Sequence, residues 1–151
     1  MKKLHILILL VCSVFFVGCL HVQMTSPSLD SDAKKFEPEP GKGNIYINRI
    51  SQWYGYDFAF QTLLDGRVVG ALAPKTYLML SVAPGKHIVA VSGADNVTQQ
   101  TVNVESGKNY FFEARCTLSG SNGQYSLRLI SEEQGRKEVT DSKRSEGATY
   151  Q

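Results

Sequence analysis

The stretch "YLMLSVAPGKHIVAVS", Tyr77–Ser92, decides the fold because it places two apolar runs on either side of a tight turn. The turn is Ala83–Lys86, in which proline fixes φ and glycine tolerates a left-handed backbone. Short runs rich in valine, isoleucine and aromatic residues are typical of strands. The stretch therefore predicts two consecutive antiparallel strands.

The same pattern of apolar runs and turn residues continues on both sides of this stretch. Asp65-Gly66 is a strong hairpin signal, because a type I′ turn needs positive φ at both central positions. The expected strands are Asn44–Ile50, Phe58–Leu64, Arg67–Leu72, Thr76–Val82, His87–Ser92, Thr98–Glu105, Asn109–Cys116 and Gln124–Ser131. We predict an all-β fold, a small antiparallel β-sandwich of about seven to eight strands over residues 44–131.

Side chains alternate between the two faces of a strand, so each run predicts which residues face the core. In "NYFFEARC" the core-facing set is Tyr110, Phe112, Ala114 and Cys116, and the solvent-facing set includes Asn109, Glu113 and Arg115. In the last strand the core-facing set is Tyr125, Leu127 and Leu129, with Ser126 and Arg128 facing out. Cys116 is thus expected to be a buried small hydrophobe. The alternative is a reactive or intermolecular thiol.

The N-terminus has the organisation of a secretory signal. Lys2 and Lys3 precede a nearly continuous apolar run from Ile6 to Val17, which is too short to span a bilayer. The residues that follow, Phe16-Val17-Gly18-Cys19, resemble the bacterial lipobox. This resemblance implies a signal peptide over residues 1–18, cleavage after Gly18, and a diacylglycerol and an N-acyl chain on Cys19. Several acyl chains anchor a protein firmly; the alternative is a secreted protein cleaved near Gly18.

The next segment, residues 19–43, predicts a lipidated flexible tether. From Met24 it reads "MTSPSLDSDAKKFEPEPGKG", which has little apolar content with which to offset its ordering entropy. Such a tether lets the folded domain stand clear of the lipid headgroups. The residue after the cysteine is Leu20 and not Asp, and in this the chain resembles lipoproteins of the Gram-negative outer membrane.

The C-terminal segment, residues 132–151, predicts a short polar helix or a frayed tail. Ser131 and Gln134 have the spacing of a capping box, and Gly135 weakens the helix. Sixteen Lys and Arg residues, less Lys2 and Lys3, leave 14 against 14 Asp and Glu in the mature chain. This neutrality argues against a nucleic-acid partner, which requires clustered Lys and Arg.

Tyr77–Cys116 also carries a family resemblance. A strand with an aromatic residue is followed by Val-x-Pro-Gly-x-His, alternating apolar residues, and then Val-x-Val-x-x-Gly-x-x-Tyr-Phe. This pattern resembles bacterial lipoproteins of the domain of unknown function 2846 family, over Gly43–Arg144, and its turn is shared with PEGA-type sandwich repeats. Family members usually have Arg-Pro after the first strand, where this chain has Arg49-Ile50. The resemblance implies a β-sandwich on a lipid anchor and supplies no enzyme activity.

Few residues of the mature chain are candidates for a site. His87 has no histidine or cysteine partners at metal-ligand spacing, so we expect it to be structural and to bond a backbone group. Ser119–Gly123 lacks the spacing of a nucleophile elbow. "SQWYGYDF" offers Trp53, Tyr54 and Tyr56 in a loop, and such residues are enriched at binding hot spots. The alternative is that these rings cover the end of the core.

These observations favour a membrane-anchored envelope lipoprotein that acts as a non-catalytic interaction module. We expect no catalytic residue, metal or cofactor beyond the acyl chains on Cys19. Its partner would be an envelope protein or a glycan. Two alternatives remain: a glycan-binding or glycan-processing factor that uses the aromatic loop, and a structural lipoprotein with no specific ligand.

Overall fold

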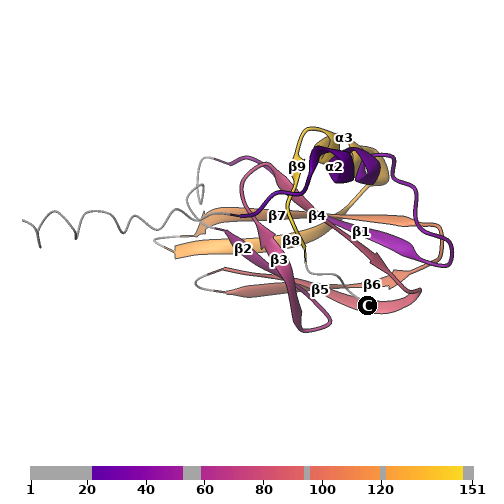
Figure 1. The fold of residues 1–151 in the computed structure, drawn as a ribbon. Coiled ribbons are helices and arrows are strands. Elements are labelled where there is room, and N and C mark those ends of the chain that lie inside the picture. Colours follow the sequence, from indigo (N-terminus) through magenta and orange to yellow (C-terminus); the bar gives the residue numbers. More distant parts are fainter. Residues whose placement is uncertain (1–21, 53–58, 94–95, 120–121, 148–151) are drawn as a thin grey trace, which may run out of the picture.

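The computed structural model describes residues 22–52, 59–93, 96–119 and 122–147. Two packed β-sheets form a sandwich, as predicted, and two short helices lie together on the outer side of one sheet (Figure 1). The strands are β1 (Gly43–Arg49), β2 (Phe60–Leu64), β3 (Arg67–Leu72), β4 (Thr76–Val82), β5 (Gly85–Ser92), β6 (Val97–Val104), β7 (Asn109–Ser119), β8 (Asn122–Ile130) and β9 (Lys143–Arg144). The helices are α2 (Pro27–Ala33) and α3 (Glu132–Thr140).

The sheets are largely, but not entirely, antiparallel. One has the order β8-β7-β1-β4-β9 and the other β3-β2-β5-β6. Contrary to the prediction, β1 pairs with β7 in parallel, and β9 with β4. Parallel pairing requires a long crossover, and here the chain passes through the four-stranded sheet between β1 and β7. The predicted hairpin is present, with positive φ at both Asp65 and Gly66.

The main core lies between the sheets and contains the apolar alternation seen in the sequence. Phe112, Ala114, Cys116, Tyr125 and Leu127 are buried there, which confirms that these five residues face the core. The prediction for Leu129 is wrong, because its side chain is 55% exposed. Strand β8 is the edge strand of its sheet, so Leu129 has a strand on one side only and remains in contact with solvent.

The prediction of a flexible tether is wrong for residues 24–43. Residues 23–42 form an ordered segment, here called the strap, which crosses the outer face of the five-stranded sheet (Figure 1). Ser26 caps the start of helix α2, because its hydroxyl accepts from the amide of Leu29, and Pro27 is the first residue of the helix. Ala33 and Phe36 are then buried against the sheet, so a few apolar residues anchor an otherwise polar segment.

A second, smaller core lies between this outer face and the helices. It contains the side chains of Ala33, Phe36, Tyr46, Tyr77, Phe111 and Val139. The rings of Tyr46 and Phe111 stack at 4.9 Å, and Phe36 packs on both at 5.4 and 5.9 Å. All seven residues of β1 are consequently buried, because both of its faces are covered.

Helix α3 confirms the predicted helical alternative for the start of the C-terminal segment. The Ser131 hydroxyl accepts from the Gln134 amide at 3.3 Å, as a capping residue does. Gly135 is more than a weak helix former, because a Cβ at this position would overlap the ring of Phe111. The missing side chain is what lets α3 lie directly on the sheet.

Candidate functional site

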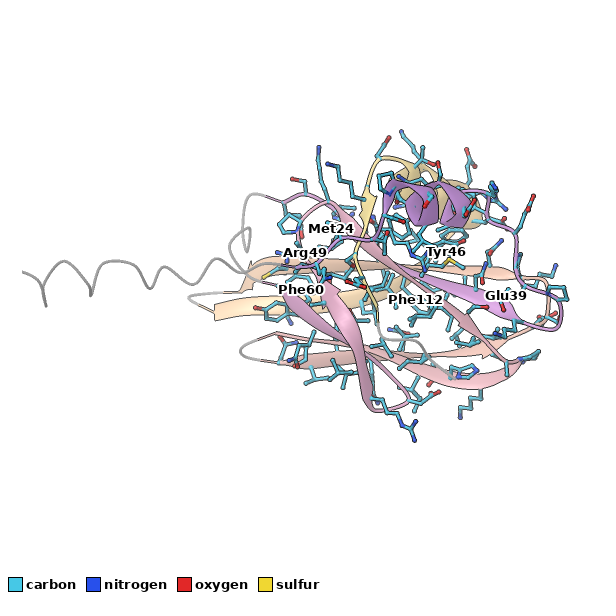
Figure 2. The ribbon with its side chains drawn as sticks, in the orientation of Figure 1. Met24, Glu39, Tyr46, Arg49, Phe60 and Phe112 are labelled. Atoms are coloured by element: carbon cyan, nitrogen blue, oxygen red, sulfur yellow. The ribbon has the colours of Figure 1, made fainter. Side chains whose placement is uncertain are left out.

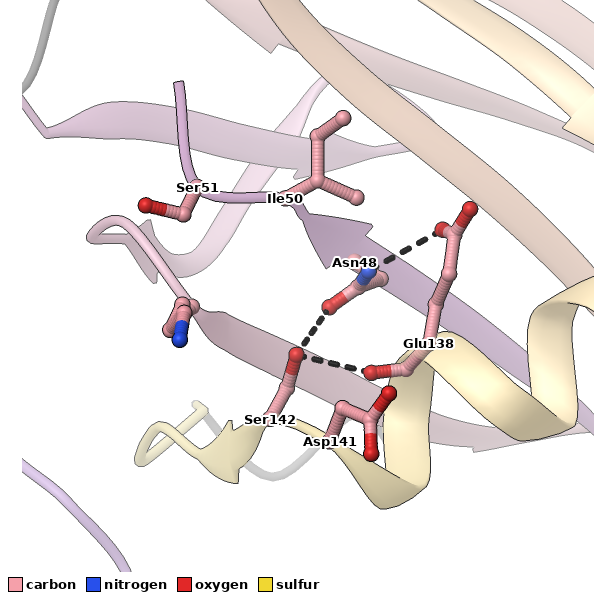
Figure 3. Close-up of a pocket in the computed structure, with 7 residues that line it drawn as sticks. Asn48, Ile50, Ser51, Glu138, Asp141 and Ser142 are labelled. Carbon is pink, nitrogen blue, oxygen red and sulfur yellow. Dashed lines mark hydrogen bonds between the residues drawn. The ribbon is translucent and has the colours of Figure 1, made fainter. Parts of the chain in front are cut away.

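A pocket of about 400 Å³ lies where β1 ends, β4 begins and α3 ends. Its lining is Asn48, Ile50, Ser51, Lys75, Glu138, Asp141 and Ser142. Figure 3 shows Ile50 and Ser51 on one side of the hollow, with Ser142 and Asp141 facing them from the α3 side. The pocket therefore combines residues from three separate parts of the chain.

Local backbone geometry places each part. The amide of Lys75 donates to the Arg49 carbonyl at 3.0 Å, which ties the start of β4 to the end of β1. Lys75 itself has a left-handed φ of 57°, and its carbonyl accepts from the amide of Lys143 at 3.0 Å. The end of α3 brings Glu138 and Ser142 over the outer face of β1, where Asn48 is 2% exposed.

The floor of the pocket is a hydrogen-bonded network (Figure 3). The Asn48 amide group donates to Glu138 Oε2 at 3.1 Å, and Gln134 donates to Glu138 Oε1 at 2.7 Å. The Ser142 hydroxyl lies 2.9 Å from Asn48 Oδ1 and 2.8 Å from the Glu138 carbonyl. A hydroxyl has one hydrogen and two lone pairs, so Ser142 Oγ keeps acceptor capacity for an outside donor.

The rim of the pocket is charged and exposed, with Lys75 and Asp141 on it. A cation, carboxylates, an amide and hydroxyls can together bind a polar ligand that both donates and accepts hydrogen bonds. Ser142 is bonded to an amide oxygen and a carbonyl, not to a base that would activate it. Across the described ranges, no group of three metal-ligating side chains comes together.

Arg49 adds a buried cation to the same end of the sandwich, on the inner face. It is 3% exposed, donates to the Leu72 carbonyl at 3.0 Å and lies 3.8 Å from the centroid of the Phe60 ring. Burial lowers the pKa of Arg49 to about 10, so the guanidinium stays charged at neutral pH. Alternation in "NIYINR" could have predicted this position, since Ile45, Ile47 and Arg49 share a face.

A buried carboxylate lies on the outer face of the five-stranded sheet, on β7, the strand next to the edge strand β8. Glu113 was predicted to face solvent, but its side chain is fully buried beside Arg115 and Arg128, with Nε–Oε1 distances of 2.6 Å. Burial raises the pKa of Glu113, but hydrogen bonds from the two guanidinium groups outweigh this and lower it. Packing of α3 on β7 explains the error, because it covers a face that alternation alone assigns to solvent.

His87 has the predicted structural role, at the opposite end of the sandwich. Its ring nitrogens lie 2.8 Å from Asp65 Oδ2 and 2.9 Å from the Ala83 carbonyl. Asp65 also accepts from the amide of Ile88 at 2.8 Å, so the pair joins the hairpin turn to β5. Burial lowers the pKa of His87, but the hydrogen bonds to Asp65 and Ala83 raise it by more, so the pKa is raised overall.

The remaining sequence candidates lie outside the described residues. These are Gly18 and Cys19 in the lipobox and Trp53, Tyr54 and Tyr56 in the aromatic loop. Gln52, which immediately precedes Trp53, accepts from the Cys116 amide at 3.0 Å, and β2 begins at Phe60. The loop thus starts and ends at the pocket end of the sandwich. Sequence reasoning missed the pocket because its residues come together only in the folded chain.

A small β-sandwich with a covered outer face and a polar end pocket defines the structural class. The family described as "Protein of unknown function (DUF2846)" matches residues 39–126, more than half of the chain, and the protein belongs to this family. An uncharacterized protein of Haemophilus influenzae is 28% identical over 124 residues, which cover 82% of this chain and 73% of the relative. Neither of the helices described has the length and hydrophobicity of a membrane span.

Proposed function

We propose that this protein is a membrane-anchored lipoprotein of the bacterial envelope, most simply of the outer membrane, and acts as a non-catalytic interaction module. The observation that carries the anchoring is the Gly18-Cys19 motif after a short apolar run and two lysines. A thioether-linked diacylglycerol and an N-acyl chain on Cys19 would hold the mature chain on the bilayer. The family match is compatible with this role and assigns no activity.

The pocket supports the interaction role. Its floor groups, Asn48 and Ser142, are buried and fixed by mutual hydrogen bonds, whereas Lys75 and Asp141 on the rim are exposed. Fixed polar groups beneath a charged rim suit selective binding, since their orientation is set before a ligand arrives. A second candidate, binding of an envelope glycan, is favoured by the same floor. Amide, hydroxyl and carboxylate groups both donate to and accept from sugar hydroxyls.

Acyl labelling tests the anchoring. Cells that express the full chain would be fed an alkyne-tagged fatty acid, with Cys19→Ala as the variant and Cys116→Ala as the control. We expect label and membrane sedimentation for the wild type and for Cys116→Ala, because Cys116 is buried in the core. Cys19→Ala should lose both. Equal sedimentation of unlabelled Cys19→Ala would contradict a lipid anchor on this residue.

Photo-crosslinking tests the interaction. A photoreactive residue at Ser51, on the pocket, would be compared in cells with one at Gln99, an exposed position on β6. A discrete adduct from position 51 that weakens with Asp141→Asn and is absent from position 99 supports the module. A glycan adduct favours the second candidate. Control-level labelling from position 51 would overturn the pocket as an interaction site and leave a structural lipoprotein.

A further inference from the structure

The strap is fixed to the sandwich at its very start. The Gln23 carbonyl accepts from the Glu146 amide at 2.7 Å, and Met24 pairs with Ser145 in an antiparallel bridge. The Thr25 amide then donates to the Arg144 carbonyl at 3.1 Å. The chain is therefore part of the folded domain from Gln23 onward.

Interactions along α2 hold the strap in place. Asp30 Oδ1 accepts from the Tyr77 hydroxyl at 2.8 Å and from the Arg144 amide at 3.0 Å. Lys34 Nζ donates to the Ser142 carbonyl at 2.7 Å, and the Tyr46 hydroxyl donates to the Ala33 carbonyl at 2.8 Å. These bonds join the strap to β1, β4 and the residues after α3. It cannot lengthen as a free chain without losing them.

The free length before the domain is consequently short. Cys19 and Gln23 are four residues apart, so even a fully extended chain spans at most about 14 Å between them. A flexible chain of that length has a root-mean-square span of about 11 Å. If the strap were free as far as Gly43, the corresponding value would be about 27 Å.

The start of the strap lies toward the pocket end of the sandwich. In Figure 2 Met24 lies near Arg49, at the end of β1, whereas Glu39 lies near the opposite end. The backbone pairings agree, because Thr25 bonds Arg144 and the adjacent Lys143 bonds Lys75 on the pocket rim. The other end of the strap bonds the turn after β6, where the Gly107 amide donates to Lys42.

We propose that the sandwich rests on the bilayer surface with the Lys75 end toward the lipid headgroups. The inference depends on acylation of Cys19, as proposed above. Lys75 and Lys143 are exposed at this end, and so are Asp141 and Glu146, so the charges there balance. Electrostatic attraction therefore does not determine which end contacts the bilayer. The short anchor does so, because it holds this end at a high effective concentration next to the membrane. A ligand would then reach the pocket along the membrane surface.

The test compares two exposed lysine positions at opposite ends of the sandwich. Lys75 immediately precedes β4, and Lys86 lies at the start of β5, after the turn that follows β4. The seven residues of β4 separate the two positions by about 23 Å along the strand axis. Acylated full-length protein with a photoreactive residue at position 75 or 86 would be placed on phosphatidylethanolamine–phosphatidylglycerol vesicles. Covalent lipid adducts would be counted by mass spectrometry. We expect about tenfold more lipid adduct from position 75, because in the proposed orientation position 86 lies about 23 Å farther from the bilayer.

A linker insertion provides the matched control. Twenty Gly and Ser residues placed between Val22 and Gln23 raise the root-mean-square span of the anchor to about 27 Å and leave the strap intact. Membrane binding should persist while the excess of adducts at position 75 falls to the level at position 86. Acylated, vesicle-bound protein with equal labelling at both positions, or an excess unaffected by the linker, overturns the orientation alone. Absence of acyl chains on Cys19 in the protein purified from cells would overturn the anchor as well.

Discussion

The two faces of the five-stranded sheet are both buried, but by different means. The inner face packs against a second sheet through side chains such as Ile45, Ile47, Leu78 and Leu80. The outer face is covered by the strap and α3, and it mixes Tyr46, Tyr77 and Phe111 with the polar groups of Asn48 and Glu113. Burial of polar groups costs free energy unless they are hydrogen-bonded. The outer face can therefore accept only a cover that supplies specific partners. Glu138 of α3 bonds Asn48, and the strap supplies acceptors for the hydroxyls of Tyr46 and Tyr77.

The inner core mainly stabilises the sandwich, whereas the outer core fixes the position of the strap. The inner core needs only apolar side chains of suitable volume, and it would hold a sandwich together in many arrangements. The outer core, through its specific bonds, determines where residues 23–42 lie and hence how far the domain extends from a lipidated Cys19.

Phe36→Ala should have the largest effect on the outer core. It removes a ring buried against Tyr46 and Phe111, and we expect the free energy of unfolding to fall by about 3 kcal/mol. Ile47→Ala on the inner face is the matched comparison, with a similar loss expected. Urea unfolding measures both. A loss below about 1 kcal/mol for Phe36→Ala, alongside a full loss for Ile47→Ala, would mean that the strap is not packed.

Gly135→Ala tests whether α3 packs directly on the sheet, because the change in the free energy of unfolding should have opposite signs in the two cases. At an exposed helix position this change stabilises by up to about 1 kcal/mol. Here the new Cβ overlaps the Phe111 ring, so we expect a loss of about 2 kcal/mol in thermal or urea unfolding. Lys137→Ala, at an exposed position of the same helix, should be close to neutral. Stabilisation by Gly135→Ala would show that α3 stands away from the sheet.

Glu113→Gln tests the polar part of the outer face. Loss of the charged bonds to Arg115 and Arg128 should cost about 1–2 kcal/mol at pH 7. The pKa of Glu113 is lowered on folding, so its contribution is present above the ordinary value of 4.5 and is lost as pH falls through the lowered pKa. Unfolding measured from pH 7 to 3 should show the two proteins converge. Parallel curves would contradict a buried, ionised Glu113.

His87→Gln should have the smallest effect, because the His87–Asp65 pair is partly exposed to solvent. The pKa of His87 is raised on folding, so its contribution is present below the ordinary value of 6.5 and is lost as pH rises through the raised pKa. Between pH 6 and 8, we expect the free energy of unfolding of the wild type to fall by less than about 1 kcal/mol relative to that of the variant. A steeper decline in the variant would be inconsistent with this pairing.

The inner core could be predicted from sequence because alternation with period two needs only one covered face. The outer core could not, since Phe111 and Glu113 share a face that looks half polar until α3 and the strap are placed over it. One signal was available: Ser26-Pro27 is a typical helix start, and Asp30 and Lys34 have the i,i+4 spacing of an ion pair. The acidic and proline-rich composition around them concealed it.

The pocket could not be predicted in the same way. Asn48 and Ser142 are 94 residues apart and meet only because α3 packs on the outer face. Arg49 was accessible from alternation alone, but its stacking on Phe60 depends on the second sheet. Sequence periodicity thus identifies faces, whereas sites between layers depend on how those layers are stacked.

The most direct test is to measure the backbone order of the strap by ¹⁵N relaxation, in the mature chain without acyl groups on Cys19. We expect order parameters of about 0.85 at Thr25, Lys34 and Phe36, equal to those of β1, because their amides donate to the carbonyls of Arg144, Asp30 and Ala33. Values below about 0.6 across residues 24–36, with a rigid β1, would restore a flexible tether and contradict a domain held at the membrane surface.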